Sequence, residues 1–218
     1  IIDKSCYNRQ PSNEKDMEIM LCSNRFIADT ENSRRLAKLP NRSFEFSAAI
    51  SGDFSIDRSP APKTLVLKRD SQIMFVKNDQ STGDRKWVNG SIAKIEFLSE
   101  ELIEVRLKCG GIHEIKKETW ENRKFKWDKK KGEITSEIIG TFEQFPIKLA
   151  WAITIHKSQG LTFEKIKIDL GTGTFANGQL YTALSRCKSI EGLNLVRPIK
   201  LEDIIVDSRV SDFSNITN

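Results

Sequence analysis

Hydrophobic and polar positions divide the chain into three regions of different texture. In the first, residues 18–22 form a short apolar run that predicts a buried strand, and Asn24 follows it as a predicted helix N-cap. Residues 24–39 predict a helix, because one set of positions recurs on a single helical face: Ala28, Asn32, Arg35, Leu36 and Leu39. A strand followed by a helix is the repeating unit of an α/β domain.

The second region, about residues 65–145, carries short β-type runs separated by turn signals. The dipeptides Asn89-Gly90 and Gly110-Gly111 supply the positive φ that tight hairpins need. Short strands at this spacing predict a small antiparallel barrel. The predicted strands are 72–76, 91–97, 102–108, 112–115 and 138–142.

The third region returns to the α/β pattern. Apolar runs at 149–155 and 166–170 predict strands, and residues 178–187 predict a helix. We therefore predict one α/β domain that is split in sequence by an inserted barrel. The predicted boundaries place its first part at 1–64, the barrel at 65–146 and its second part at 147–218.

Composition narrows the class of protein only slightly. The 218 residues carry a net charge of +5, which mildly favours a polyanionic partner. No apolar run approaches the roughly 20 residues that cross a bilayer, so we expect no membrane partner. The four cysteines and two histidines are scattered, which predicts reduced thiols, a cytoplasmic protein and no metal site. Because the chain begins at Ile1 without an apolar leader, we expect a mature product or a piece of a longer protein.

The strongest local pattern is the segment 154–163, in which an apolar strand ends in a turn of small and polar residues. Such a turn presents backbone N–H groups, the Ser158 hydroxyl and the Lys157 ammonium, and Gly160 permits close approach of a phosphate. The alternative is a solvated connection with a buried histidine, and the residues alone leave both open.

A second pattern lies in the predicted helix 178–187. Its apolar face comprises Leu180, Ala183, Leu184 and Cys187, and its polar stripe comprises Gln179, Thr182 and Arg186. An arginine held on a packed helix can reach a transferring phosphoryl group. The residues alone favour the simpler reading, in which Arg186 complements the carboxyl end of the helix.

Together, TIHKSQGLTF at 154–163 and GQLYTALSRC at 178–187 resemble motifs V and VI of superfamily-one DNA helicases. The resemblance is greatest to the branch of RecD and the petite-integration-frequency (PIF) helicases. Residues 21–24 with Asn32 are similar to the motif IV region of that branch. Residues 72–78 and 87–90 are similar to the start of its SH3-like insertion. A second branch of the superfamily has Glu where this chain has Thr162, so a ribose contact is not expected here.

The resemblance implies the second RecA-like domain of a P-loop-NTPase-type helicase, with an inserted SH3-like barrel. It implies that the parent protein translocates on single-stranded DNA, in the 5′-to-3′ direction, and unwinds duplexes. Arg186 would contact the γ-phosphate. The residues implied at the nucleotide cleft are Gln159, Gly160, Gln179 and Tyr181, and those implied toward DNA are Asn24, Thr154, His156, Lys157 and Ser158.

No G-x-x-x-x-G-K-[ST] loop and no acidic Walker B pattern occur in the sequence. In the family these lie on an N-terminal RecA-like domain, so the resemblance implies that this domain of the same parent holds most of the ATP and Mg²⁺. The chain alone should then hydrolyse no ATP. The resemblance further implies that the parent protein acts in DNA repair, recombination or telomere maintenance. It also implies a bacterial protein that is associated with the nucleoid. The alternative is a non-enzymatic single-stranded nucleic-acid-binding module.

One further run, 123–131, mixes basic residues with Phe125 and Trp127. Interleaving of this kind can contact a nucleic-acid backbone and stack bases. The residues alone favour the other reading, a solvated hairpin whose aromatic side chains cap the barrel.

Overall fold

The structure is a computed structural model that describes residues 6, 17–81, 84–108, 110–129, 132–207 and 209. It forms two compact units. One comprises Ile1–Lys38 with Ala150–Asn218, and the other comprises Leu39–Leu149. Both edges of the second unit lie outside the predicted insertion of 65–146. Strands before residue 65 pair within the unit, and residues 147–149 pair with residues 73–75.

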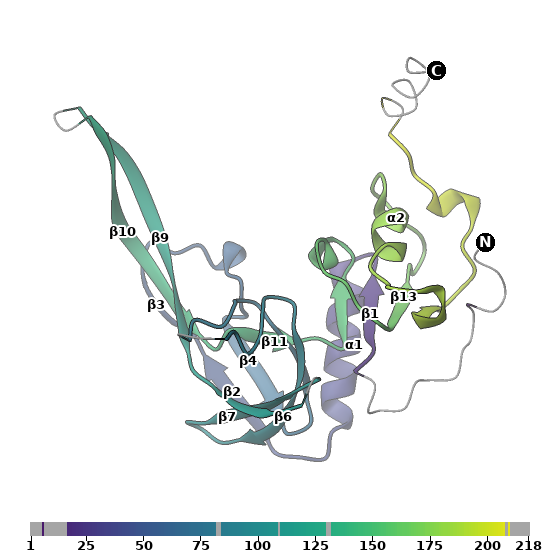
Figure 1. The fold of residues 1–218 in the computed structure, drawn as a ribbon, viewed down its shortest axis with the longest axis horizontal. Helices are drawn as coiled ribbons and strands as arrows, with labels where there is room; N and C mark the ends of the chain where they lie inside the picture. Colours follow the sequence, from purple (N-terminus) through teal and green to yellow (C-terminus); the bar gives the residue numbers. More distant parts are fainter. Residues whose placement is uncertain are drawn as a thin grey trace. The chain divides into compact units, whose positions relative to one another are not determined.

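The first unit is built on a four-stranded sheet in which all strands are parallel, in the order β12-β1-β13-β14 (Figure 1). The strands are β1 (Ile19–Cys22), β12 (Ala152–Thr154), β13 (Ile166–Asp169) and β14 (Leu193–Leu195). Their residues are mostly buried, as expected for a parallel sheet covered on its faces. This confirms the α/β pattern predicted for the first and third regions.

Helix α1 (Arg25–Lys38) follows β1 as predicted. The side-chain oxygen of Asn24 accepts a hydrogen bond from Ile27 N at 3.0 Å, which confirms the predicted N-cap. The predicted inward face is also confirmed, since Ala28 is buried and the other four positions are half-buried. The other helices among the described residues are short: α2 (Gln179–Leu184) and the 3₁₀ turns η3 (Ile56–Arg58), η4 (His156–Ser158), η5 (Ile190–Gly192) and η6 (Leu201–Asp203). In the described part of the chain, none of the helices combines the length and apolar character of a membrane span.

Asn32 attaches α1 to the sheet. Its side-chain amide donates to Ala152 O at 2.8 Å and accepts from Ala152 N at 2.9 Å, so it satisfies both backbone groups of one residue on edge strand β12. Asn32→Ala should lower the free energy of unfolding by about 1–3 kcal/mol, because both groups lose their partner. Urea denaturation of the chain measures this, with exposed Ser33→Ala as the matched control on α1. Equal effects of the two substitutions would contradict the assignment.

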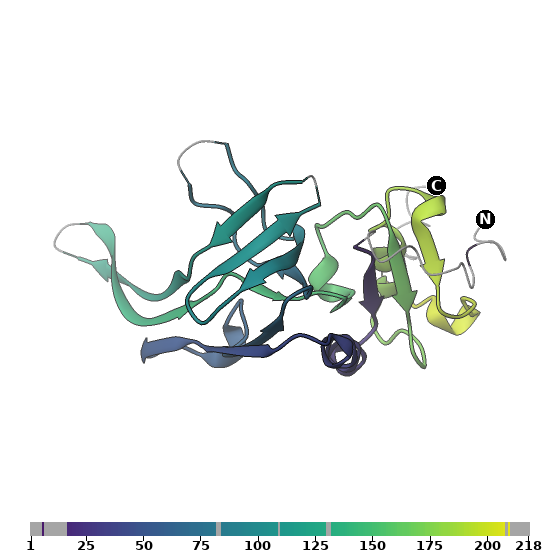
Figure 2. The same cartoon turned by 90° about the horizontal axis from the view of Figure 1, so that it is seen from below.

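The second unit contains three antiparallel sheets (Figure 2). The largest has the order β11-β5-β6-β7-β8, a two-stranded sheet pairs β2 with β4, and a three-stranded sheet has the order β3-β10-β9. The bounds are β2 (Ser43–Ser47), β3 (Ala49–Gly52), β4 (Thr64–Lys68), β5 (Gln72–Phe75), β6 (Ile92–Leu98), β7 (Ile103–Leu107), β8 (Ile112–Ile115), β9 (Glu118–Asp128), β10 (Glu133–Gln144) and β11 (Ile147–Leu149).

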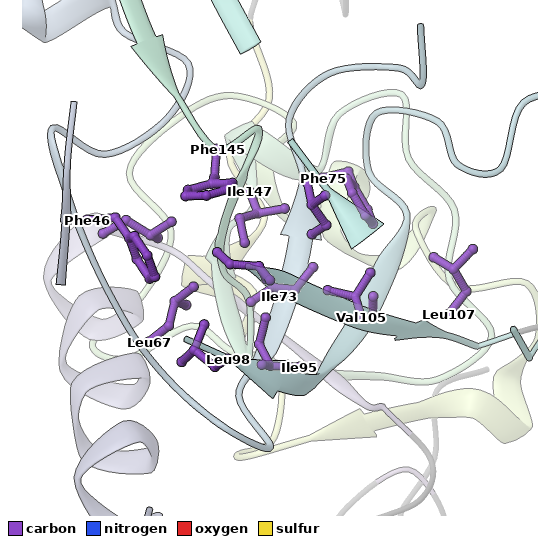
Figure 3. Close-up of a cluster of buried hydrophobic side chains, with 14 residues drawn as sticks. Phe46, Leu67, Ile73, Phe75, Ile95, Leu98, Val105, Leu107, Phe145 and Ile147 are labelled. Atoms are coloured by element: carbon purple, nitrogen blue, oxygen red, sulfur yellow. The ribbon is translucent and has the colours of Figure 1, made fainter. Parts of the chain in front are cut away.

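One apolar core joins two of these sheets (Figure 3). Phe46 and Leu67 of the small sheet pack with residues of the large sheet such as Ile73, Ile95 and Val105. The strands predicted from the alternating pattern are present. Among the described strands, however, the five-stranded sheet ends at β11 and β8 without closing, so a closed barrel is not formed.

Strands β9 and β10 form a long hairpin with two different halves. In the inner half, Trp120 packs on Phe142, with ring centroids 5.8 Å apart, and β10 pairs with β3 through Gly140–Glu143. In the outer half, residues 123–128 of β9 pair only with residues 133–138 of β10. A register shift between Ile138 and Gly140 marks the change from one half to the other.

Candidate site at the carboxyl edge of the parallel sheet

The parallel strands β1, β12 and β13 all end at one edge of the sheet, and the motif residues follow them there. In open α/β sheets, ligands bind at this carboxyl edge. Ile155 N donates to Cys22 O at 2.9 Å, and Ser23 N donates to Asp169 O at 3.2 Å. The three strand ends are therefore tied to one another directly beneath the candidate site.

The polar side chains of the 154–160 turn fall into two groups, one buried or half-buried in the fold and one exposed to solvent. Ser158 is completely buried, and its hydroxyl donates to Ile155 O at 2.6 Å. Thr154 is half-buried, and its hydroxyl oxygen accepts from Lys157 N at 3.4 Å. Both hydroxyls therefore shape the turn. The predicted contact of Ser158 with DNA is corrected for this conformation, since the side chain has no exposed surface.

The outward group comprises His156, Lys157 and Gln159, all exposed. The buried histidine of the alternative interpretation is therefore wrong, because His156 is exposed. Gly160 adopts a φ of +78°, a region that favours glycine, and a Cβ atom there would meet no atom within 4 Å. The glycine is required by backbone conformation, and the space beside it is open to a ligand.

Helix α2 contributes a buried glutamine to this edge. Gln179 donates from Nε2 to Ser23 O at 3.0 Å, and its Oε1 accepts from Phe175 N at 3.0 Å. The predicted polar stripe is therefore wrong at this position, because the distant Ser23 carbonyl and the nearby Phe175 N–H satisfy the amide inside the fold. Leu180 and Ala183 are buried as predicted, and Tyr181 is 75% exposed.

Arg186 joins the two motif segments. Its Nη1 donates to Leu161 O at 3.0 Å, its Nε donates to Thr182 O at 3.0 Å, and its Nη2 donates to Ser185 Oγ at 2.9 Å. The hydrogen bond to Thr182 O agrees with the simpler interpretation of the sequence, in which Arg186 complements the carboxyl end of the helix. All three acceptors are neutral, so an anionic phosphate oxygen would be a stronger partner for the same guanidinium.

The backbone makes the same connection. Phe163 N donates to Arg186 O at 2.8 Å, and Lys188 N donates to Phe163 O at 3.0 Å. Side chain and backbone together therefore bond Arg186 to the segment that follows the turn.

Sequence reasoning missed a buried ion pair behind the site. Arg197 binds Asp203 through both oxygens, at 2.8 and 2.6 Å, and donates from Nε to Gly171 O at 2.9 Å. Asp203 is 2% exposed, and the hydrogen bonds from Arg197 hold the pKa of its carboxyl below the usual range. The pair fixes the loop that leads from β13 to α2. The only sequence signal was an Arg and an Asp six residues apart, which is too common to be informative.

Cys22, at the end of β1, is not a candidate nucleophile. Burial, followed by the charge of Asp169, raises the pKa of its thiol to about 12, so the thiol stays protonated near neutral pH. Asn24 lies beyond it with its side-chain oxygen bound to Ile27 N.

The parallel sheet and the two linked motifs at its carboxyl edge place this chain in the class of superfamily-one DNA helicases. No family model matches the chain. The related proteins and the similar solved structures described below are all PIF1 helicases. The family within that class is that of the PIF1 helicases.

Two relatives illustrate the sequence similarity. The chain is 33% identical over 211 residues to the ATP-dependent DNA helicase Pif1 of Bdellovibrio bacteriovorus, covering 94% of this chain and 44% of that protein. It is 34% identical over 181 residues to the ATP-dependent DNA helicase PIF1 of Xenopus laevis, covering 81% of this chain and 27% of that protein. The chain thus spans less than half the length of these relatives.

Solved structures give the same result. Unliganded Pif1 from Bacteroides sp has a TM-score of 0.81 at 33% identity, covering 94% of this chain and 46% of that chain. Bacteroides Pif1 bound to single-stranded DNA has a TM-score of 0.75 at 32% identity, covering 98% of this chain and 48% of that chain. The mixed α/β fold of this chain therefore matches that of PIF1 helicases.

Proposed function

We propose that the chain is the second motor domain of an ATP-dependent DNA helicase. In this proposal the first unit is a RecA-like domain and the second is an SH3-like insertion. The observation that carries the proposal is the bond from Arg186 Nη1 to Leu161 O, which joins the phosphate-sensing helix to the DNA-facing turn. The similarity to Pif1 structures, one of them in complex with ADP-AlF4, supports it.

ATP would lie between this domain and an N-terminal RecA-like domain of the same parent, which would hold the nucleotide and Mg²⁺ through its phosphate-binding loop. From this chain, Arg186 is the cation suited to the γ-phosphate, with Gln159 and Gly160 facing the cleft. Gln179 supports the site indirectly by holding Ser23 and Phe175. Without that loop the chain would hydrolyse no ATP by itself.

The DNA track would follow the outward group of the turn, His156 and Lys157, with Thr154 and Asn24 beside them. When Arg186 exchanges Leu161 O for a phosphate oxygen, the turn loses one of its anchors. Closure on ATP would thus shift the DNA contacts and drive translocation, in the 5′-to-3′ direction that the family implies. Strand separation would follow as the parent moves along single-stranded DNA into the duplex.

Lys157→Ala should weaken the binding of the chain to single-stranded DNA and lower the slope of log affinity against log salt by about 0.7, because one phosphate contact is lost. Fluorescence anisotropy with labelled oligo-dT at several salt concentrations measures both quantities. The control is Lys38→Ala, an exposed lysine in the last turn of α1. A slope that stays the same in Lys157→Ala, or falls equally in the control, would remove this turn from the DNA track.

A further inference from the structure

The outer half of the β9–β10 hairpin, residues 123–138, exposes large hydrophobic side chains along one face. The exposed fractions are 67% for Phe125, 60% for Trp127, 68% for Ile134 and 49% for Ile138. Trp127 lies opposite Ile134, Phe125 opposite Ser136, and Arg123 opposite Ile138. Because alternate residues of a strand share a face, all six residues line the same side of the ribbon.

This face is not an extension of the core. Trp120 packs on Phe142. Because alternate residues of β9 point to opposite faces, Phe125 and Trp127 lie on the face opposite Trp120. The reading in which the two aromatic side chains cap the barrel is therefore wrong. A two-stranded ribbon is marginally stable by itself, and a contiguous exposed apolar face marks an interaction surface.

The charges of the ribbon favour a polyanion as the partner. Residues 122–138 contain six basic and three acidic side chains. Arg123 lies on the aromatic face, where its Nη1 donates to Ser136 Oγ at 3.3 Å. The ion pair from Arg123 to Glu121 is exposed to solvent, so exchanging it for a phosphate contact costs little.

The spacing of the two rings favours a single strand. Same-face neighbours on a strand lie about 6.7 Å apart, whereas stacked bases in a duplex strand lie about 3.4 Å apart. Each ring can therefore take one base of an extended strand, and the bases of a duplex are not free to stack on side chains.

We propose that the outer hairpin is a second binding site for single-stranded nucleic acid, separate from the 154–160 turn. Bases stack on Phe125 and Trp127, and Arg123 on the same face contacts the backbone. This inference goes beyond the proposed motor function, because a hairpin of this kind would bind a single strand whether or not the parent protein hydrolyses ATP.

The test is the double substitution Phe125→Ala with Trp127→Ala in the chain that already carries Lys157→Ala, so that binding at the turn is reduced beforehand. The affinity for labelled oligo-dT should fall by at least about tenfold, since each ring contributes to stacking. The conservative pair Phe125→Tyr with Trp127→Phe should retain most of the affinity. Phe97→Ala, an aromatic residue of the same unit that is 48% exposed on β6, is the matched control.

Three results would overturn the proposal: an unchanged affinity in the double variant, an equal loss in Phe97→Ala, or equal binding of duplex DNA of the same length. An unchanged affinity would assign the apolar face to a protein partner instead. The two sites fail independently. If the ring substitutions do not change the affinity for oligo-dT, the loss of affinity in Lys157→Ala still stands. If Lys157→Ala does not change that affinity, the loss caused by the ring substitutions still stands.

Discussion

Replacing Arg186 by alanine in the complete helicase should lower the DNA-stimulated rate of ATP hydrolysis by roughly 10³-fold or more, the range seen for arginines that contact a transferring phosphoryl group. Two features of the structure support this expectation. The guanidinium is held two residues past the end of α2 by three hydrogen bonds, and it now donates to neutral oxygens that a phosphate oxygen would outcompete. Single-turnover hydrolysis, with and without single-stranded DNA, measures the effect.

The matched control is Lys188→Ala, which removes an exposed cation two residues further along the same segment. Its rate should stay close to that of the unmodified protein. Thermal unfolding of both variants checks that loss of the bonds from Arg186 has not unfolded the turn. If hydrolysis persists in Arg186→Ala, the arginine is only a helix-end contact. The chain would then be better described as a nucleic-acid-binding module without motor function.

Arg197→Ala should have the largest effect on folding, lowering the free energy of unfolding by about 3–5 kcal/mol, because it removes the charged partner of the buried Asp203 carboxylate and leaves it the hydrogen bond from Lys200 N. The folded-state pKa of Asp203 is depressed, so its contribution is present above its unfolded pKa of about 3.9 and is lost as pH falls through the lower folded value. The difference in the free energy of unfolding between Arg197→Ala and the unmodified chain should therefore become smaller in acid.

Urea denaturation at pH 7 and in acid measures both expectations. The chain offers a close control, the pair between Arg209 and Asp207, which has the same 2.6 Å contact but an arginine that is 87% exposed. Arg209→Ala should change the free energy of unfolding by no more than about 0.5 kcal/mol. Comparable losses in the two variants would mean that burial does not determine the strength of the Arg197 pair.

The elements that depend on local chemistry could be predicted from the sequence. The cap at Asn24, the inward face of α1 and strands β5 to β8 of the five-stranded sheet follow from neighbouring residues alone, whereas β11 was not predicted. Strand β9 could not be predicted in this way, because its residues are polar or charged at nearly every position. It forms because it pairs along its whole length with β10.

The two motif segments lie at one edge of the parallel sheet, as the sequence predicts, but the direction of their side chains was not predictable. Gln179 and Ser158 are polar, so a pattern of polar and apolar positions assigns them to the surface. Each is buried because a backbone group accepts its hydrogen bond, Ser23 O for Gln179 and Ile155 O for Ser158. The first of these partners lies 156 positions away, and such pairing depends on tertiary structure.

The Asn32 amide also bears on how the sheet meets other chains. Strand β12 is an outer strand, and unpaired backbone groups on outer strands recruit strands from neighbouring molecules. Asn32 fills both hydrogen-bonding positions of Ala152 with a side chain of the same polypeptide. An incoming strand would have to displace α1 before it could pair there, so a single asparagine protects this side of the sheet against edge-to-edge aggregation.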